Sequence, residues 1–186
     1  MTKYLKVMFG NKGINYEYKI NEVNVANTWN PSANDPKEMG GFNFSTEDKI
    51  LRWLVRGDTL YDVEIPSDAE IIECQSESAP HGVFRSNKII ITNPRAMTDD
   101  IAMNFYLKSN LPDKSYFKSL AGVAIRGYRK TSLKIIEDRI NKDNIDLVLS
   151  EIEDFVKPYQ SSGTSENGTE VYEEVMEILQ NIKNNS

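Results

Sequence analysis

The first half of the chain alternates apolar and polar residues with the two-residue period of β-strands. "KYLKVMF" and "YEYKI" flank the turn signal Asn11-Lys12-Gly13, and "NKIIIT" is apolar enough to lie in the centre of a sheet. The pattern predicts an antiparallel or mixed sheet over residues 3–92. Its strands are expected at 3–9, 16–20, 41–45, 59–65, 69–74 and 87–92.

After Asn93-Pro94 the apolar residues recur with a helical period. Thr98 before two aspartates, Pro112, and Asn144 or Asp143 are typical helix starts, and residues 132–140 continue the helical pattern. One further helix is expected inside the first half, over residues 46–55 behind a Ser45 or Thr46 cap. A sheet followed by a packed helical half is an α+β fold.

The end of the chain differs in composition from the rest. Residues 1–157 are predicted to form a single α+β domain, and the polar, Gly/Ser-rich residues 158–169 a flexible linker. Residues 170–186 are predicted to form an acidic amphipathic helix, with Val171, Val175, Ile178 and Ile182 along one side. That stripe needs a partner, which is either the domain itself or a second copy in a homodimer through 170–184.

Composition limits the chemistry. Among 186 residues there are one cysteine and one histidine, so neither an internal disulfide nor an ordinary zinc site is expected, and no metal or cofactor is predicted. No apolar run reaches the roughly 20 residues of a membrane span. The amino-terminal residues lack a signal-peptide core, so a cytoplasmic location and no membrane partner are expected.

Charge is arranged in blocks. Residues 85–142 contain 12 Lys/Arg and 5 Asp/Glu, whereas residues 143–186 contain 2 Lys/Arg and 10 Asp/Glu, and the whole chain carries −6. The basic segment either neutralises its acidic flanks or contacts nucleic acid. The candidate nucleic-acid contacts are Arg126, Arg129, Lys130 and Lys134.

Two polar segments are candidate sites. Residues 27–41 are rich in Asn, Pro, Ser, Asp and Gly but contain Trp29 next to Asn30, and this tryptophan either plugs the loop onto the core or offers a stacking face. The stretch "APHGVFRSNK" holds His81 and Arg85 ahead of the central strand. It is either a simple turn or a site in which Arg85 binds a phosphate or carboxylate.

Several segments resemble an uncharacterised protein family of low-GC bacteria and their phages. The similar segments are "YEYKI", "WNP", "GGFNFS", "LYDVEIP" and "SNKIII" followed by "NPRAMTDD", and they span roughly residues 3–155. This resemblance implies a phage or mobile-element protein in a bacterial host cell. The leading hypothesis is a non-catalytic interaction protein that binds a host macromolecule, and an inhibitor of nucleic-acid-binding host defence, such as an anti-CRISPR protein, is its most specific form.

A weaker resemblance points to an enzyme. "KVMFG", "GFNFST" and "TLYDVEIP" are similar in order and spacing to segments that surround NAD in ADP-ribosyltransferases. The resemblance implies NAD near Trp29, Ser45, Thr46 and Arg85. The chain departs from that pattern at the end of its first strand, where Met8 and Phe9 replace the usual Arg or His.

Overall fold

The computed structural model describes residues 1–75, 81–158 and 166–185, and it confirms the predicted α+β class. An antiparallel sheet lies within residues 4–96 and a helical half follows it. The chain divides into two compact units, which are described separately. Unit 1 comprises residues 1–50 and 56–97, and unit 2 comprises residues 51–55 and 98–186.

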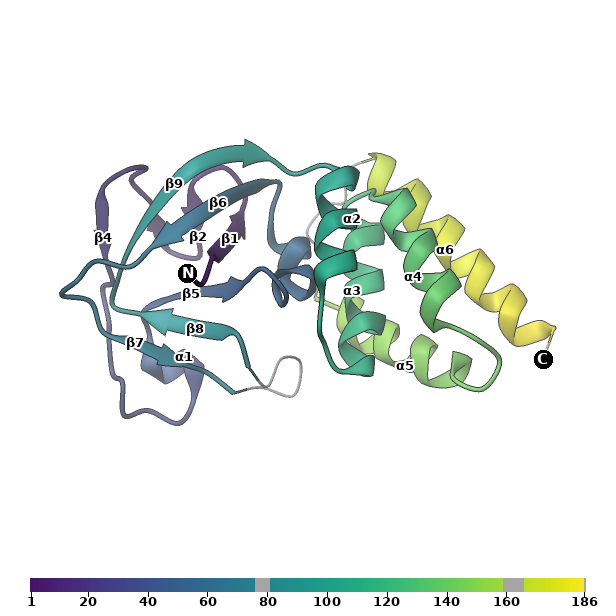
Figure 1. The fold of residues 1–186 in the computed structure, drawn as a ribbon. Helices are drawn as coiled ribbons and strands as arrows, with labels where there is room; N and C mark the ends of the chain where they lie inside the picture. The colour runs from purple at the N-terminus through teal and green to yellow at the C-terminus, as the bar shows by residue number, and fades with distance from the viewer. Residues whose placement is uncertain (76–80, 159–165, 186) are drawn as a thin grey trace. The chain divides into compact units, whose positions relative to one another are not determined.

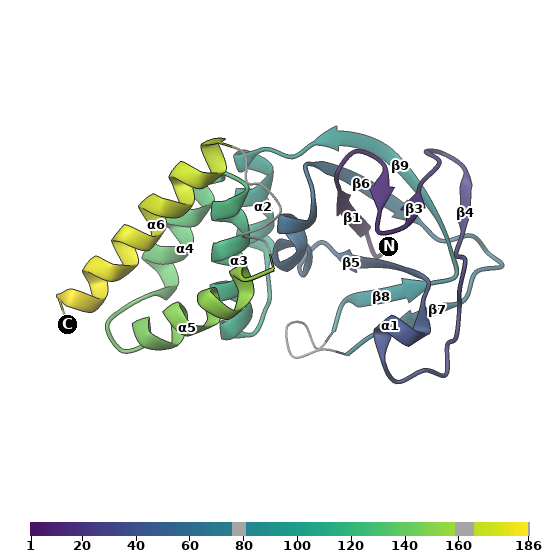
Figure 2. The same cartoon turned by 180° about the vertical axis from the view of Figure 1, so that it is seen from behind.

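Unit 1 is built from short strands and one helical turn (Figure 1; Figure 2). Its elements are β1 (Tyr4–Met8), β2 (Lys12–Gly13), β3 (Tyr16–Glu17), β4 (Val23–Val25), α1 (Pro36–Met39), β5 (Phe42–Thr46), β6 (Thr59–Glu64), β7 (Ile71–Glu73), β8 (Val83–Ser86) and β9 (Lys88–Ala96). Within the described residues, seven of these strands form one sheet in the order β4-β9-β6-β1-β5-β8-β7, and β2 pairs with β3 separately.

A sharp bend in the chain connects the two halves of the sheet. β8 and β9 lie far apart in the strand order, yet only Asn87 separates them in the chain. The Ser86 hydroxyl spans this bend, because its Oγ donates to the Lys88 carbonyl oxygen at 2.8 Å. The chain therefore passes directly from β8 to β9, although these two strands do not pair, and β4 and β7 are the two edges of the sheet.

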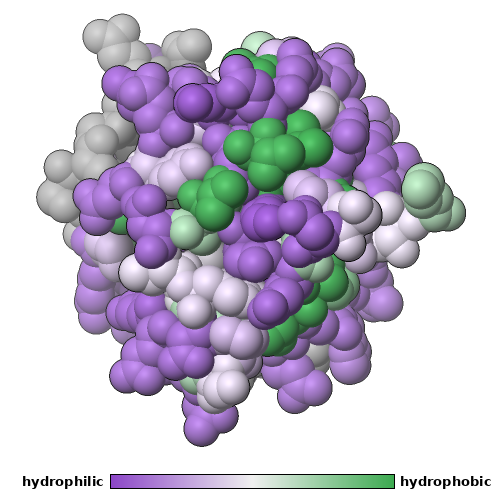
Figure 3. Space-filling model, turned by 90° about the vertical axis from the view of Figure 1, so that its left-hand side faces the viewer, coloured by the Kyte–Doolittle hydropathy of each residue, from purple (hydrophilic) through white to green (hydrophobic). Residues whose placement is uncertain are grey.

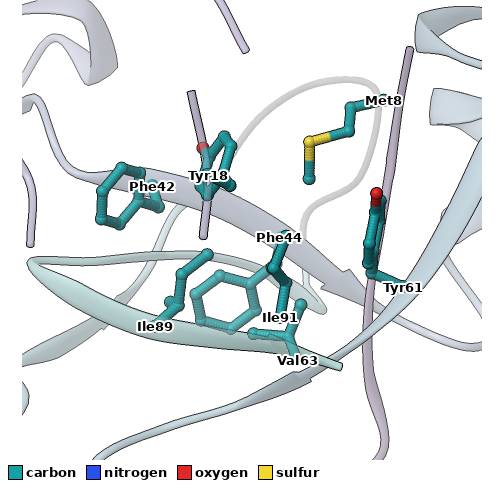
Figure 4. Packing of buried hydrophobic residues seen from close by; sticks show 8 residues of the cluster. All are labelled: Met8, Tyr18, Phe42, Phe44, Tyr61, Val63, Ile89 and Ile91. Carbon is teal, nitrogen blue, oxygen red and sulfur yellow. The ribbon is translucent and has the colours of Figure 1, made fainter. Parts of the chain in front are cut away.

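Alternate residues of these strands, together with Tyr18, form the core of unit 1 (Figure 4). This core cluster consists of Met8, Tyr18, Phe42, Phe44, Tyr61, Val63, Ile89 and Ile91. The rings of Tyr18 and Phe42 are in contact, with centroids 5.1 Å apart. Every second position points inward because side chains alternate across a pleated strand. Burial of these large apolar and aromatic side chains holds unit 1 together.

Three predictions about the first half are wrong in detail. Residues 83–86 are a strand and not a turn, since they pair with β5 and β7. Residues 36–39 form a helical turn inside the predicted loop, where the Asp35 carboxylate accepts from the Lys37 N–H at 2.8 Å. The expected helix over 46–55 is instead the 3-10 helix η1 (Ile50–Arg56). It begins late because the Thr46 N–H pairs with the Gly82 carbonyl, which keeps Thr46 in β5.

Unit 2 consists of helices and the central part of η1 (Figure 1). The helices are α2 (Asp99–Lys108), α3 (Asp113–Ile125), α4 (Arg129–Arg139), α5 (Ile145–Val156) and α6 (Glu166–Asn184). Thr98 caps α2 as predicted, with its Oγ1 accepting from the Ile101 N–H at 3.2 Å. α3 is buried along almost its whole length and contacts α4, α5 and α6.

The carboxyl-terminal helix packs within unit 2. Its residues Val171, Val175 and Leu179 are buried, and α6 contacts α3, α4 and α5. Of the predicted stripe, Val171 and Val175 are buried within the chain, whereas Ile178 and Ile182 are half-buried, and the homodimer stays a prediction. α6 begins at Glu166, four residues before the predicted start, and residues 159–165 of the predicted linker lie outside the described residues. The domain boundaries stay a prediction, because compactness alone does not measure independent folding.

Candidate functional site

The free edge of β4 is the first feature of the candidate site. β4 pairs with β9 through Val23 with Ile90, Asn24 with Ile89 and Val25 with Lys88, and the Ala26 N–H donates to the Asn87 carbonyl. In an antiparallel ladder, pairs that exchange hydrogen bonds alternate with pairs that do not. Asn24 therefore bonds toward β9, whereas the N–H and C=O groups of Val23 and Val25 point away from the sheet.

The side chains of the same two valines are exposed. Val23 is 49% and Val25 54% exposed, and the half-buried Ile90 lies opposite Val23 on the same face. Figure 3 views the side of the molecule on which β4 lies in Figure 1, and apolar patches interrupt its polar surface. We call the free edge of β4 together with the side chains of Val23, Val25 and Ile90 the β4 surface.

Asn24 anchors this strand. Its side chain is 1% exposed, and its Oδ1 accepts from the Lys19 N–H at 2.8 Å. Its Nδ2 donates to the carbonyl oxygens of Lys19 and Glu22 at 2.9 and 3.1 Å. These three hydrogen bonds hold the chain that enters β4.

The next segment, residues 27–41, packs against the rest of unit 1. The Trp29 indole N–H donates to Glu70 Oε2 at 2.7 Å, and its ring lies against Gly41, where an added Cβ would come within 2.6 Å of the ring. Trp29 is half-buried and lies outside the core cluster, so both of its predicted roles stay predictions. Asn30 is exposed, and its backbone N–H bonds to the Met39 carbonyl.

Arg85 forms a hydrogen bond to the same segment, residues 27–41. It lies in β8, half-buried, and its Nη1 donates to the Gly40 carbonyl at 2.7 Å. Burial is the main cause that lowers the pKa of its guanidinium. The structure therefore brings Trp29 and Arg85 together at Gly41 and Gly40, while the hydrogen bond of Trp29 goes to Glu70 and that of Arg85 to Gly40.

Ser45, Thr46 and His81 gather at the other end of the β5–β8 pair. Ser45 is 1% exposed and donates to the Thr46 carbonyl, while Thr46 Oγ1 donates to Asp48 Oδ1 at 2.6 Å. His81 is exposed, and its Nδ1 lies 3.8 Å from Glu73 Oε1. Ser45 is too deeply buried in this structure to contact a ligand.

The four basic candidates of unit 2 are bonded within the chain. Arg126 Nε donates to the Val55 carbonyl at 2.7 Å. Arg129 makes two bonds to the Glu174 carboxylate at 2.8 and 2.6 Å. Lys130 pairs with Asp100 at 3.2 Å, and Lys134 pairs with Glu137 and Asp138. Much of the basic segment is thus neutralised locally, and nucleic-acid binding through it stays a prediction.

Sequence reasoning missed Lys6, a buried amine. Lys6 is 8% exposed, its Nζ donates to the carbonyl oxygen and Oδ1 of Asn43 at 2.6 and 2.7 Å, and it lies 5.4 Å from the Tyr18 ring centroid. Burial, followed by the nearby cations Arg56 and Arg85, lowers the pKa of this amine to about 7. The sequence signal for this burial is the position of Lys6, which shares one face of an alternating strand with Tyr4 and Met8.

Metal sites and membrane-crossing helices are absent from the described residues. In these parts of the chain, no three or more His, Cys, Asp or Glu side chains gather in a way that could hold a metal ion. A membrane-crossing helix is likewise missing from residues 1–75, 81–158 and 166–185, since none there combines the required length with the required apolarity.

Comparisons with known proteins identify no relative. No protein-family model, no curated protein sequence and no solved structure matches this chain.

Proposed function

We propose that this protein is a non-catalytic binding protein that recognises a partner protein through the β4 surface. One observation carries the proposal. Two valines, each about half exposed, lie on a strand whose outer hydrogen-bonding groups have no neighbouring strand among the described residues. Apolar side chains beside unpaired backbone groups are typical of places where another chain binds.

The residues proposed to bind NAD or nucleic acid favour the binding-protein proposal over these two alternative functions. Trp29, Arg85 and Thr46, placed near NAD by the enzyme hypothesis, each donate a hydrogen bond within unit 1. Arg129, Lys130 and Lys134 are paired with carboxylates that phosphates would have to displace. A host macromolecule as the partner, defence machinery included, rests on the sequence resemblance alone.

Site-specific photocrosslinking tests the proposal. A photoreactive phenylalanine derivative replaces Val25 in one version of the full chain and the exposed Lys142 in the control version. In bacterial cells that produce the protein, irradiation is expected to join a partner to position 25 and not to position 142. If position 25 yields no cross-linked protein beyond that of the control, the proposed function is wrong.

A further inference from the structure

We propose that the β4 surface binds its partner by strand addition, with an extended peptide segment of the partner protein lying alongside β4 as an eighth strand. This inference rests on the proposed function and specifies the kind of partner. It follows from backbone geometry, from the composition of the edge and from the length of β4.

The backbone of β4 presents a regular set of outward groups. Because Asn24 bonds toward β9, the N–H and C=O groups of Val23 and of Val25 face the free side. Within the described residues, none of the hydrogen bonds outside the regular strand ladders uses these groups. An incoming strand would pair with both valines and skip Asn24, as in any ladder.

Natural edges are blunted by a short strand, by lysine, proline or bulges, or by a covering helix or loop. β4 has the first of these protections, since it is three residues long, but it lacks the others. The sequence Val-Asn-Val contains no charge and no proline, and the ladder to β9 runs through all three residues without a shift in register. The nearby Lys19 and Glu22 face each other at 3.9 Å. The edge is therefore open to another strand.

The length of β4 favours a peptide over a second copy of the chain. Three residues span only about 10 Å, because a strand rises about 3.3 Å per residue. A stable interface between two folded proteins buries roughly 800 Å² per partner and involves about 20 to 30 residues on each side. Two copies meeting at β4 would bring together far fewer residues, whereas a short extended segment can use the whole of this edge.

The side chains of β4 define which peptide fits. Val23 and Val25 lie on the outer face of the sheet, whereas Asn24 points inward and is buried. Residues opposite the two valines would place their side chains on that same outer face, at every second position of the peptide. We therefore expect a segment with apolar, preferably β-branched, residues at alternate positions and no proline between them.

Two substitutions at one position separate backbone pairing from side-chain contact. Val25→Pro removes an N–H that points away from β9 and keeps the hydrogen bonds between β4 and β9, and proline is tolerated on the solvent side of an edge strand. Val25→Thr keeps this N–H and the β-branched shape. A displayed library of random linear peptides is selected on the wild-type chain, and each enriched peptide is then measured against both variants.

The expected result is a set of enriched peptides with alternating apolar residues. They should bind the Val25→Thr variant about as well as wild type and the Val25→Pro variant about tenfold more weakly. In the wild-type chain, each peptide should slow hydrogen exchange of the Val23 and Val25 amides but leave the buried Val7 amide unchanged. This exchange measurement decides the question even if the proline variant does not fold.

Three results would overturn strand addition. They are the absence of any enriched peptide, enriched peptides that leave Val23 and Val25 exchange unchanged, and a wild-type dimer in solution that Val25→Pro dissociates. Crosslinks from position 25 together with one of the first two results would leave the proposed function standing and eliminate this binding mode. If crosslinking from position 25 also failed, both the proposed function and strand addition would be wrong.

Discussion

Lys6 donates two hydrogen bonds to Asn43, at 2.6 Å to its carbonyl oxygen and at 2.7 Å to its side-chain Oδ1. The residues belong to β1 and β5, whose pairing covers only Tyr4 with Thr46 and Leu5 with Ser45. The amine therefore reaches Asn43 beyond the point where the two strands stop pairing, and it supplies a donor to a carbonyl that lies outside this ladder.

The free energy of unfolding should rise with pH between about 7 and 10 because of the Lys6 amine. The pKa of Lys6 is about 7 in the folded chain, against an ordinary value of 10.5. Below pH 7 both states carry the proton, and the folded state bears the full cost of a buried charge. Above pH 7 the folded state releases the proton while the unfolded state keeps it, so the free energy of unfolding increases. The raised pKa of the Tyr18 hydroxyl, caused mainly by burial, reverses this trend above about pH 10.

The Lys6→Met variant tests this account. Urea unfolding at a series of pH values should show the rise in wild type, with a slope approaching about 1.4 kcal/mol per pH unit. The slope should disappear in Lys6→Met and persist in the control Lys12→Met, since Lys12 is exposed. A wild-type slope retained in Lys6→Met would assign it to another group.

Asp99 is predicted to be the cap of a helix to which it does not belong. It lies in α2, but its carboxylate accepts from the N–H groups of Lys130 and Thr131 at 2.7 and 3.0 Å, at the start of α4. Tyr128 occupies the N-cap position of α4 without a side-chain cap. Asp99→Ala should lower the free energy of unfolding by about 1 to 2 kcal/mol. Asp100→Ala, in the same turn of α2, is the control and should have little effect in the same urea titrations.

Gly57 is predicted to be intolerant of any side chain. A Cβ there would come within 2.1 Å of the Met8 backbone, although the φ of 176° is ordinary extended geometry. Gly57→Ala should therefore cost about 3 kcal/mol through overpacking. At Gly10 a Cβ would meet nothing within 4 Å, and the φ of +55° should cost Gly10→Ala only about 1 kcal/mol. Equal melting temperatures for the two variants would contradict the close approach of Gly57 to β1.

NAD is predicted to leave the melting temperature of the protein unchanged. Ser45 is buried, and Trp29 and Arg85 bond to Glu70 and to the Gly40 carbonyl. A thermal-shift titration with NAD at millimolar concentration provides the measurement. A saturable rise in melting temperature that Ser45→Ala abolishes would favour the enzyme hypothesis.

The sequence predicted the elements that depend on local pattern. Thr98 begins α2 because a threonine before two aspartates satisfies the first N–H groups without help from elsewhere in the chain. β1 and β6 follow from simple alternation over five or six residues. These signals lie within one segment and need no distant partner.

The features missed in the sequence depend on distant pairing. β8 was interpreted as a turn because Pro80-Gly82 and Ser86-Asn87 flank it, yet Arg85 is in a strand since it pairs with Asn43. β4 is three residues long, so the valines of "NEVNV" give too short an alternation to indicate an edge strand. The alternating pattern places Lys6 on the same face of β1 as Tyr4 and Met8, but it does not reveal that the lysine on this face is buried.

Hydrogen exchange of the Val23 and Val25 amides tests the central claim most directly. The exchange is measured in the full chain, alone and with the partner that photocrosslinking identifies. We predict that both amides exchange readily in the free protein, because they point away from β9, and at least about tenfold more slowly in the complex. Unchanged exchange at both amides in a saturated complex would contradict the claim that β4 is the surface at which the partner binds.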